Sequence, residues 1–185
     1  ILIAPSWNYN KKNYFNENFD LIIQEILDKG YKVRFRPHPE NLKRSQSLLL
    51  NIKNKYIQRN FIFDDKPENI ESMKRAKCLI TDNSGIAIEY TLILKKPVIY
   101  FNDYDKIHNT EYDEYKNLMT IEEKIKNNFG YTFKINNLDQ IDKIIETSID
   151  NFKNKDKEIN NFINENFYNF GNTINHFKEK IIKNF

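Results

Sequence analysis

The segment "TDNSGIAIE", residues 81–89, places small polar side chains directly after an apolar run. Such a segment, followed by renewed apolar periodicity, predicts a corner between a strand and a helix. Ser84 and Gly85 would lie at the start of that helix, where the first backbone N–H groups have no partner within the helix. Those N–H groups favour an anion such as phosphate. Gly85 would let an oxygen approach the backbone closely, and Ser84 would add a hydroxyl donor.

Three other side chains complete the candidate ligand set at this corner. Glu89 follows one turn later on the same helical face, where it could accept hydrogen bonds from ribose hydroxyls. Asp82 and Asn83 directly precede Ser84. A simpler alternative is that the side chain of Asp82, Asn83 or Ser84 is only the helix N-cap, which contributes about 1 kcal/mol and needs no ligand. Glu89 would then be a partly exposed helix residue.

The segment "RFRPHPE", residues 34–40, is the second candidate. Arg34, Arg36 and His38 alternate with other residues, so on a strand they share one face. The two prolines stiffen the end of that strand and would hold the imidazole in a fixed place. His38 could bind a phosphate oxygen or transfer a proton. The alternative is a turn in which His38 only hydrogen-bonds a neighbouring loop.

The remaining reactive side chains are weaker candidates. Ser6, in "APSW", lies at the predicted end of the first strand and would line a cleft or cap the core. Asp103, Asp105 and His108 have a spacing that fits no metal site, so we predict a solvated loop and no bound metal. Cys78 lies in an apolar run and is predicted to be a core residue. A single cysteine excludes an internal disulfide and suits a reducing compartment.

These segments need a scaffold, and apolar periodicity predicts one. Strands are expected at residues 1–7, 31–39, 60–65, 76–82, 96–101 and 131–135. Helices are expected at 19–29, 41–56, 67–75, 85–94, 120–128, 137–152 and 157–184, the last interrupted at Gly171, with a polar loop at 8–18. This alternation predicts an α/β fold with a Rossmann-like parallel sheet and helices on both faces. We expect a single nucleotide-binding domain over residues 1–185.

Composition narrows the functional classes. The formal net charge of +3 is too small to predict a nucleic-acid partner. No apolar run approaches the roughly 20 residues that span a bilayer. The chain begins at Ile1 in a pattern typical of the middle of a fold, so we expect a fragment of a larger protein.

Taken together, these motifs resemble the C-terminal lobe of the GT-B nucleotide-sugar enzymes. The chain is most similar to the CDP-glycerol glycerophosphotransferase family, which makes teichoic acids and related capsule polymers. The similar segments are "APSW", "RPHP", "TDNSGIAIE", "KPVIYF" and "FYNFGNT". Asn83 and Gly85 depart from the family's "DYSS", and Glu89 stands where an Asp is commoner. The same corner also resembles "TDSGGxxEE" of the UDP-N-acetylglucosamine 2-epimerases.

The resemblance implies a set of roles. His38, Ser84 and Gly85 would contact the donor diphosphate, and Glu89 the ribose. Asn172 and Thr173 would approach the same phosphates from the C-terminal helix. The other expected substrate-binding residues are Ser6, Arg36, Asp82 and Asn83. No metal or other cofactor is implied.

Three functions follow as alternatives. The first is a CDP-glycerol-type glycerophosphotransferase, in which an acceptor hydroxyl attacks the β-phosphorus, CMP leaves and His38 is catalytic. Its polymer or lipid-linked acceptor would bind a preceding lobe, at the cytoplasmic face of the membrane, and this lobe alone would turn over poorly. The second is a UDP-sugar glycosyltransferase or 2-epimerase-like enzyme, which predicts a uridine preference. The third is a non-catalytic flavodoxin-like binding domain, which predicts no nucleotide affinity.

Overall fold

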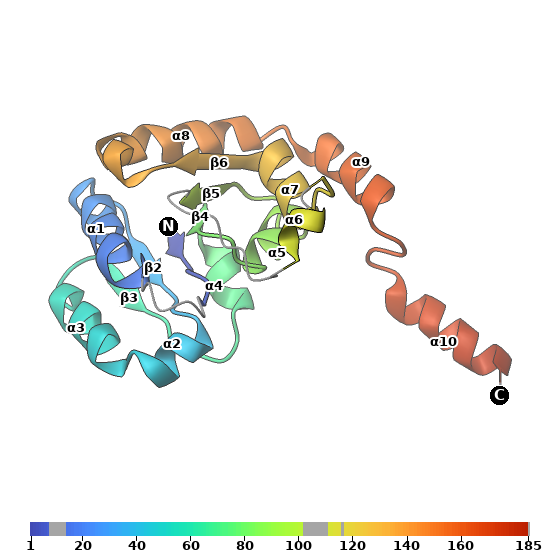
Figure 1. Cartoon of the computed structure of the whole chain (residues 1–185), viewed down its shortest axis with the longest axis horizontal. Coiled ribbons are helices and arrows are strands. Elements are labelled where there is room, and N and C mark those ends of the chain that lie inside the picture. Colours follow the sequence, from blue (N-terminus) through green and yellow to red (C-terminus); the bar gives the residue numbers. More distant parts are fainter. Residues whose placement is uncertain (8–13, 102–110, 116, 185) are drawn as a thin grey trace.

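The computed structural model describes residues 1–7, 14–101, 111–115 and 117–184, and its centre is a parallel sheet (Figure 1). Every strand pair is parallel. The six strands are β1 (Leu2–Ile3), β2 (Val33–Phe35), β3 (Phe61–Phe63), β4 (Leu79–Thr81), β5 (Val98–Phe101) and β6 (Gly130–Phe133). The predicted Rossmann-like α/β fold is therefore confirmed.

The order of the strands across the sheet is β3-β2-β1-β4-β5-β6. The chain builds outward from β1 to β3 and then returns to the other side of β1 to begin β4. This is the order of the dinucleotide-binding fold and not the 2-1-3-4-5 order of flavodoxin. The flavodoxin-like alternative therefore does not describe this sheet. Ligands of open parallel sheets bind outside the carboxyl ends of the strands where the order reverses, which here lies between β1 and β4.

Helices cover both faces of the sheet (Figure 1). They are α1 (Tyr14–Asp28), α2 (Pro39–Arg44), α3 (Gln46–Tyr56), α4 (Ile70–Arg75), α5 (Ile86–Leu92), α6 (Tyr112–Tyr115), α7 (Ile121–Phe129), α8 (Ile141–Phe152), α9 (Asp156–Asn166), α10 (Thr173–Asn184) and the 3₁₀ helix η1 (Ile135–Gln140).

Neighbouring residues of the central strands β1, β4 and β5 point into different cores, because side chains alternate along a strand. Ile3 and Ile80 join one apolar cluster with the buried faces of α1, α3 and α8. Leu2 and Leu79 join a second cluster with α4 and α5. Both faces of the sheet are therefore buried, which explains the continuous apolar runs of β1 and β4.

The structure corrects several predicted boundaries. The helix expected at 41–56 is two helices, because Ser45 leaves the helical conformation at φ −125° and ψ 37°. The apolar spacing continues across this break and does not reveal it. Residues 14–18 belong to α1 and not to a loop, whereas residues 8–13 and the Asp103–His108 segment lie outside the described residues. The expected interruption at Gly171 is present between α9 and α10, with φ +77°.

Helix α10 extends away from the sheet beyond α9 (Figure 1). Ile174, Phe177 and Ile182 on this helix are exposed. In the described ranges, none of the helices combines the length and apolar character needed to cross a bilayer.

Candidate functional site

Ser6 and Asp82 meet where the strand order reverses. The parallel pairing places Ile3 beside Ile80, so both residues follow the ends of adjacent strands. The backbone N–H and the hydroxyl of Ser6 each donate to a different carboxylate oxygen of Asp82, both at 2.7 Å. Ser6 is 8% exposed and Asp82 is 4% exposed. The two predicted site residues are therefore brought together, and their contact ties the ends of β1 and β4.

The corner after Asp82 contains hydrogen-bond donors that have no acceptor within the described part of the chain. Gly85 is the N-cap of α5, and no side chain caps this helix. The alternative that Asp82, Asn83 or Ser84 caps the helix is therefore wrong. The described residues provide no acceptor for the backbone N–H groups of Gly85 and Ile86, or a partner for the hydroxyl of Ser84.

The backbone at Gly85 is accessible. Gly85 is exposed, and a Cβ added there would meet no atom within 4 Å. Its φ of −58° is one that any residue adopts. The fold therefore does not require glycine at this position. A requirement for glycine would have to come from a ligand that approaches the backbone.

His38 follows β2, on the other side of β1. It lies three residues beyond Phe35, which pairs with Ile3. His38 and Ser6 therefore lie the same number of residues beyond the ends of two adjacent strands. His38 is the N-cap of α2, and its Nδ1 accepts the backbone N–H of Glu40 at 3.2 Å. His38 therefore caps its own helix, and its contact with a ligand or with a neighbouring loop stays a prediction. A neutral ring that accepts at Nδ1 carries its proton on Nε2, so this imidazole is a hydrogen-bond donor.

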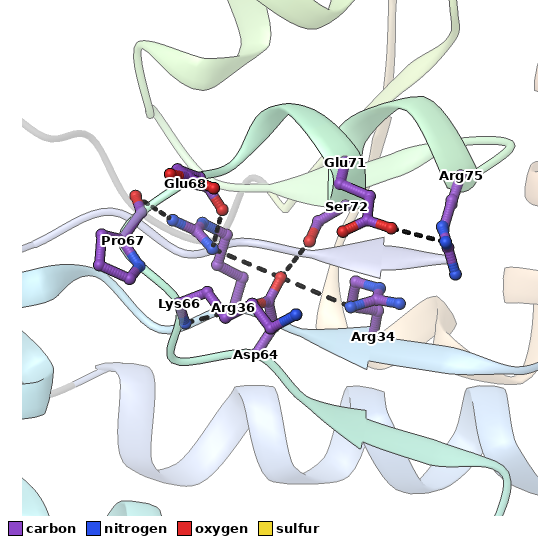
Figure 2. A network of polar contacts seen from close by, with 9 residues as sticks. All are labelled: Arg34, Arg36, Asp64, Lys66, Pro67, Glu68, Glu71, Ser72 and Arg75. Carbon is purple, nitrogen blue, oxygen red and sulfur yellow. Dashed lines mark hydrogen bonds and ion pairs between the residues drawn. The ribbon is translucent and has the colours of Figure 1, made fainter.

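A buried carboxylate lies beside this turn, at the end of β3. Figure 2 shows Asp64 with Arg34 and Arg36 of the neighbouring chain segment around it. Its Oδ2 lies 3.4 Å from Arg36 Nη1 and 3.7 Å from Arg34 Nη1, and it accepts the hydroxyl of Ser72. The backbone N–H of Lys66 donates to Oδ1 at 3.4 Å. The side chain of Asp64 is only 1% exposed.

Asp64 and Ser72 are not among the predicted site residues. The available signal was an acid at the end of a predicted strand, in "NFIFDD". Arg36, by contrast, is a predicted residue, and its guanidinium also donates to the carbonyls of Pro67 at 3.1 Å and Glu68 at 3.2 Å. Its direct contact with a substrate stays a prediction.

The electrostatic surroundings lower the pKa of Asp64 below its usual 3.8. Burial alone would raise this pKa. The hydrogen bond from Ser72, the charge of Arg36, the amide of Lys66 and the charge of Arg34 together outweigh burial and favour the ionised form.

This shift predicts an acid-dependent loss of stability. Because the pKa is lower in the folded chain, the stabilisation by Asp64 is complete above the unfolded value of 3.8 and is lost as the pH falls through the lower folded value. We expect the difference in free energy of unfolding between the wild type and Asp64→Asn to shrink below about pH 4. Urea denaturation at pH 7, 5, 4 and 3 measures it. A constant difference over this range would contradict the assignment.

The remaining predicted residues are not brought to the corner by a described contact. Glu89 is exposed on α5. Asn172 and Thr173 lie at the start of α10, the helix that extends away from the sheet (Figure 1). The hydroxyl of Thr173 donates to the carbonyl of Asn169 at 3.0 Å, and Asn172 Oδ1 accepts Asn175 Nδ2 at 2.9 Å. Their contacts with a donor stay predictions.

A cavity of about 690 Å³ lies at the amino ends of the strands. Lys32, Asn60 and Lys77, which precede β2, β3 and β4, line it. It is therefore separate from the corner at the carboxyl ends. In the described part of the chain, no group of three or more His, Cys, Asp or Glu side chains is placed to hold a metal ion.

The model of the CDP-glycerol:poly(glycerophosphate) glycerophosphotransferase family matches residues 1–172. The matched range contains every strand of the sheet, together with Ser6, His38, Asp82 and the 83–85 corner. No curated protein matches the chain.

Proposed function

Because this chain belongs to the CDP-glycerol:poly(glycerophosphate) glycerophosphotransferase family, we propose that it is the domain that binds the nucleotide-activated donor. In this proposal the donor is CDP-glycerol or a similar polyol nucleotide, bound across the carboxyl ends of β1, β2 and β4. The chain would form one lobe of a GT-B fold, with the acceptor held by another lobe.

One observation carries the donor site. Two backbone N–H groups, of Gly85 and Ile86, have no acceptor in the described chain and lie next to the free hydroxyl of Ser84. Consecutive backbone donors at the start of a helix bind phosphate oxygens. The Ser6–Asp82 pair fixes the corner from which these groups project. The proposed ligand of the corner is thus the donor diphosphate, and Glu89 is proposed to accept hydrogen bonds from the ribose.

The proposed reaction is phosphoryl transfer. An oxygen of the acceptor forms a bond with the β-phosphorus, and the bond from that phosphorus to the bridging oxygen breaks, so that CMP leaves and the hydroxyl proton passes to water. Charge accumulates on the leaving phosphate. The N–H at Nε2 of His38, favoured by the contact of Nδ1 with Glu40, would donate a hydrogen bond to that charge and keep its proton. His38 is therefore proposed as a catalytic hydrogen-bond donor that stabilises the leaving phosphate.

The family name indicates a poly(glycerophosphate) product. We place the reaction in the synthesis of a cell-surface polymer, of the teichoic acid or capsule type. The activated donor and the acceptor would then meet at the cytoplasmic face of the membrane, where the complete protein would be peripherally associated.

The direct test is the variant Gly85→Ala. The added methyl group meets no atom of the chain, so the free energy of unfolding is expected to stay within about 0.5 kcal/mol of the wild type. The methyl would occupy the approach of a phosphate oxygen, so the Kd for CDP-glycerol is expected to rise at least about tenfold, or 1.4 kcal/mol. Calorimetric titration of the full-length protein measures this.

Asn54→Ala is the matched control. Asn54 is exposed near the end of α3, which leads to the amino end of β3 and away from the carboxyl ends of the strands. Its Kd should equal that of the wild type. An unchanged Kd for Gly85→Ala would reject the corner as the diphosphate site. Parallel titrations with CDP, UDP and UDP-N-acetylglucosamine distinguish the donors, since tighter uridine binding would favour the UDP-sugar alternative.

A further inference from the structure

The turn that carries His38 is held from several directions. The two neighbouring prolines, Pro37 and Pro39, fix their own φ angles. The contact between His38 Nδ1 and Glu40 orients the ring at the other end. Few free dihedral angles therefore separate the imidazole from Arg36, the last residue before the turn. The position of the imidazole depends on what holds Arg36.

Arg36 is held by a different part of the chain. Its guanidinium lies between the Asp64 carboxylate and the carbonyls of Pro67 and Glu68, in the connection from β3 to α4 (Figure 2). The backbone N–H of Arg36 also donates to Ile3 of β1 at 2.9 Å. These contacts hold both the backbone and the guanidinium of Arg36, and its side chain is 13% exposed.

Among the described residues, Asp64 is the only acid that forms an ion pair with both Arg34 and Arg36. Arg34 and Arg36 bring two positive charges to one carboxylate, and Ser72 of α4 donates to the same oxygen. Removing the negative charge would leave two largely buried guanidinium groups close together without a counter-ion. Such a loss favours movement of at least one arginine.

We propose that Asp64 is a positioning residue that holds Arg36 and, through it, keeps the His38 imidazole directed toward the donor phosphates. The proposal rests on the proposed function, because His38 must contact the donor. It assigns Arg36 an indirect role in place of a direct phosphate contact. A misplacement of about 1 Å at a reacting group is enough to matter for binding and catalysis.

A double-mutant cycle on donor affinity tests this inference. The full-length protein would carry His38→Asn, Asp64→Asn or both, and the Kd for CDP-glycerol would be measured by calorimetry. We expect His38→Asn to weaken binding about tenfold or more, since it removes a hydrogen bond to a charged group. Asp64→Asn alone should weaken binding about fivefold, and should have no further effect when His38 is already replaced.

Equal weakening by Asp64→Asn in both backgrounds would overturn the positioning role and leave the donor site intact. No effect of His38→Asn would overturn both the positioning role and the part of His38 in the proposed function, while the Gly85→Ala result would still decide on the corner. If Asp64→Asn does not fold, Ser72→Ala removes one hydrogen bond to the same carboxylate and should show the same coupling to His38.

Asp20→Asn is the matched control. Asp20 of α1 is a carboxylate that contacts Lys55 at 2.7 Å and the hydroxyl of Tyr56 at 2.8 Å, away from the turn. Its replacement also removes an ion pair and should lower stability, but the Kd for CDP-glycerol should not change. A loss of affinity in Asp20→Asn equal to that in Asp64→Asn would show that general destabilisation explains the effect.

Discussion

Replacing Asp82 by alanine is expected to lower the free energy of unfolding by about 3 kcal/mol and to abolish measurable donor binding. The carboxylate accepts two bonds of 2.7 Å from Ser6, and both residues are buried. Hydrogen bonds to charged groups contribute about 1.5–3 kcal/mol each, and a buried donor without an acceptor costs a further 1–3 kcal/mol. Donor binding would fail because the corner at 83–85 follows directly from Asp82.

Urea denaturation measures the first effect and calorimetric titration with CDP-glycerol the second. Ser6→Ala is the matched control, because it removes the hydroxyl bond but keeps the backbone N–H bond to Asp82. Its cost should be about 1.5 kcal/mol, the lower end of the range for one hydrogen bond to a charged group. If Asp82→Ala were no more destabilising than Ser6→Ala, the contact would not hold the two strands as described.

Replacing Gly130 by alanine is expected to cost about 1–3 kcal/mol in the free energy of unfolding, with no direct effect on the donor site. A Cβ at this position would lie 2.6 Å from the carbonyl oxygen of Lys126 and 2.7 Å from a ring carbon of Tyr100. The carbonyl belongs to the backbone of α7, and Tyr100 is 4% exposed. Neither neighbour can move without disturbing the packing of α7 against the sheet.

This effect would arise from space and not from backbone conformation, since Gly130 has φ −84°. Thermal and urea denaturation measure it. Gly85→Ala provides the comparison, because the same methyl group meets no atom there. A stability for Gly130→Ala within about 0.5 kcal/mol of the wild type would contradict the close packing of Tyr100 on β6.

The sequence was sufficient for the fold class but not for the order of the strands. Alternating apolar runs predict a parallel sheet, because each crossover needs a helix. They do not show that the chain reverses after β3, which depends on how whole elements pack. The sequence therefore predicts Ser6 and Asp82 separately and does not predict their contact, since 76 residues separate them.

The local sequence pattern does not reveal two features of the site. The acid at the end of β3 reads as an ordinary loop residue, because only the folded chain brings Arg34, Arg36 and Ser72 around Asp64. The sequence offers two alternatives for His38, a ligand of the donor or a turn residue. The folded chain makes His38 the N-cap of α2 through Nδ1, a contact that the residue order alone does not predict, and its contact with a donor stays a prediction.

The central position of β1 has a consequence for synthesis on the ribosome. Both neighbours of this first strand come later in the chain, β2 with Phe35 and β4 with Ile80. A nascent chain that has released β1, β2 and β3 can pair them, but one edge of β1 keeps unpaired backbone groups until β4 emerges. Such an open edge is a template for wrong pairing with another chain. The demand for chaperones should therefore peak before β4 leaves the exit tunnel and fall once Ala4 can donate to the carbonyl of Ile80.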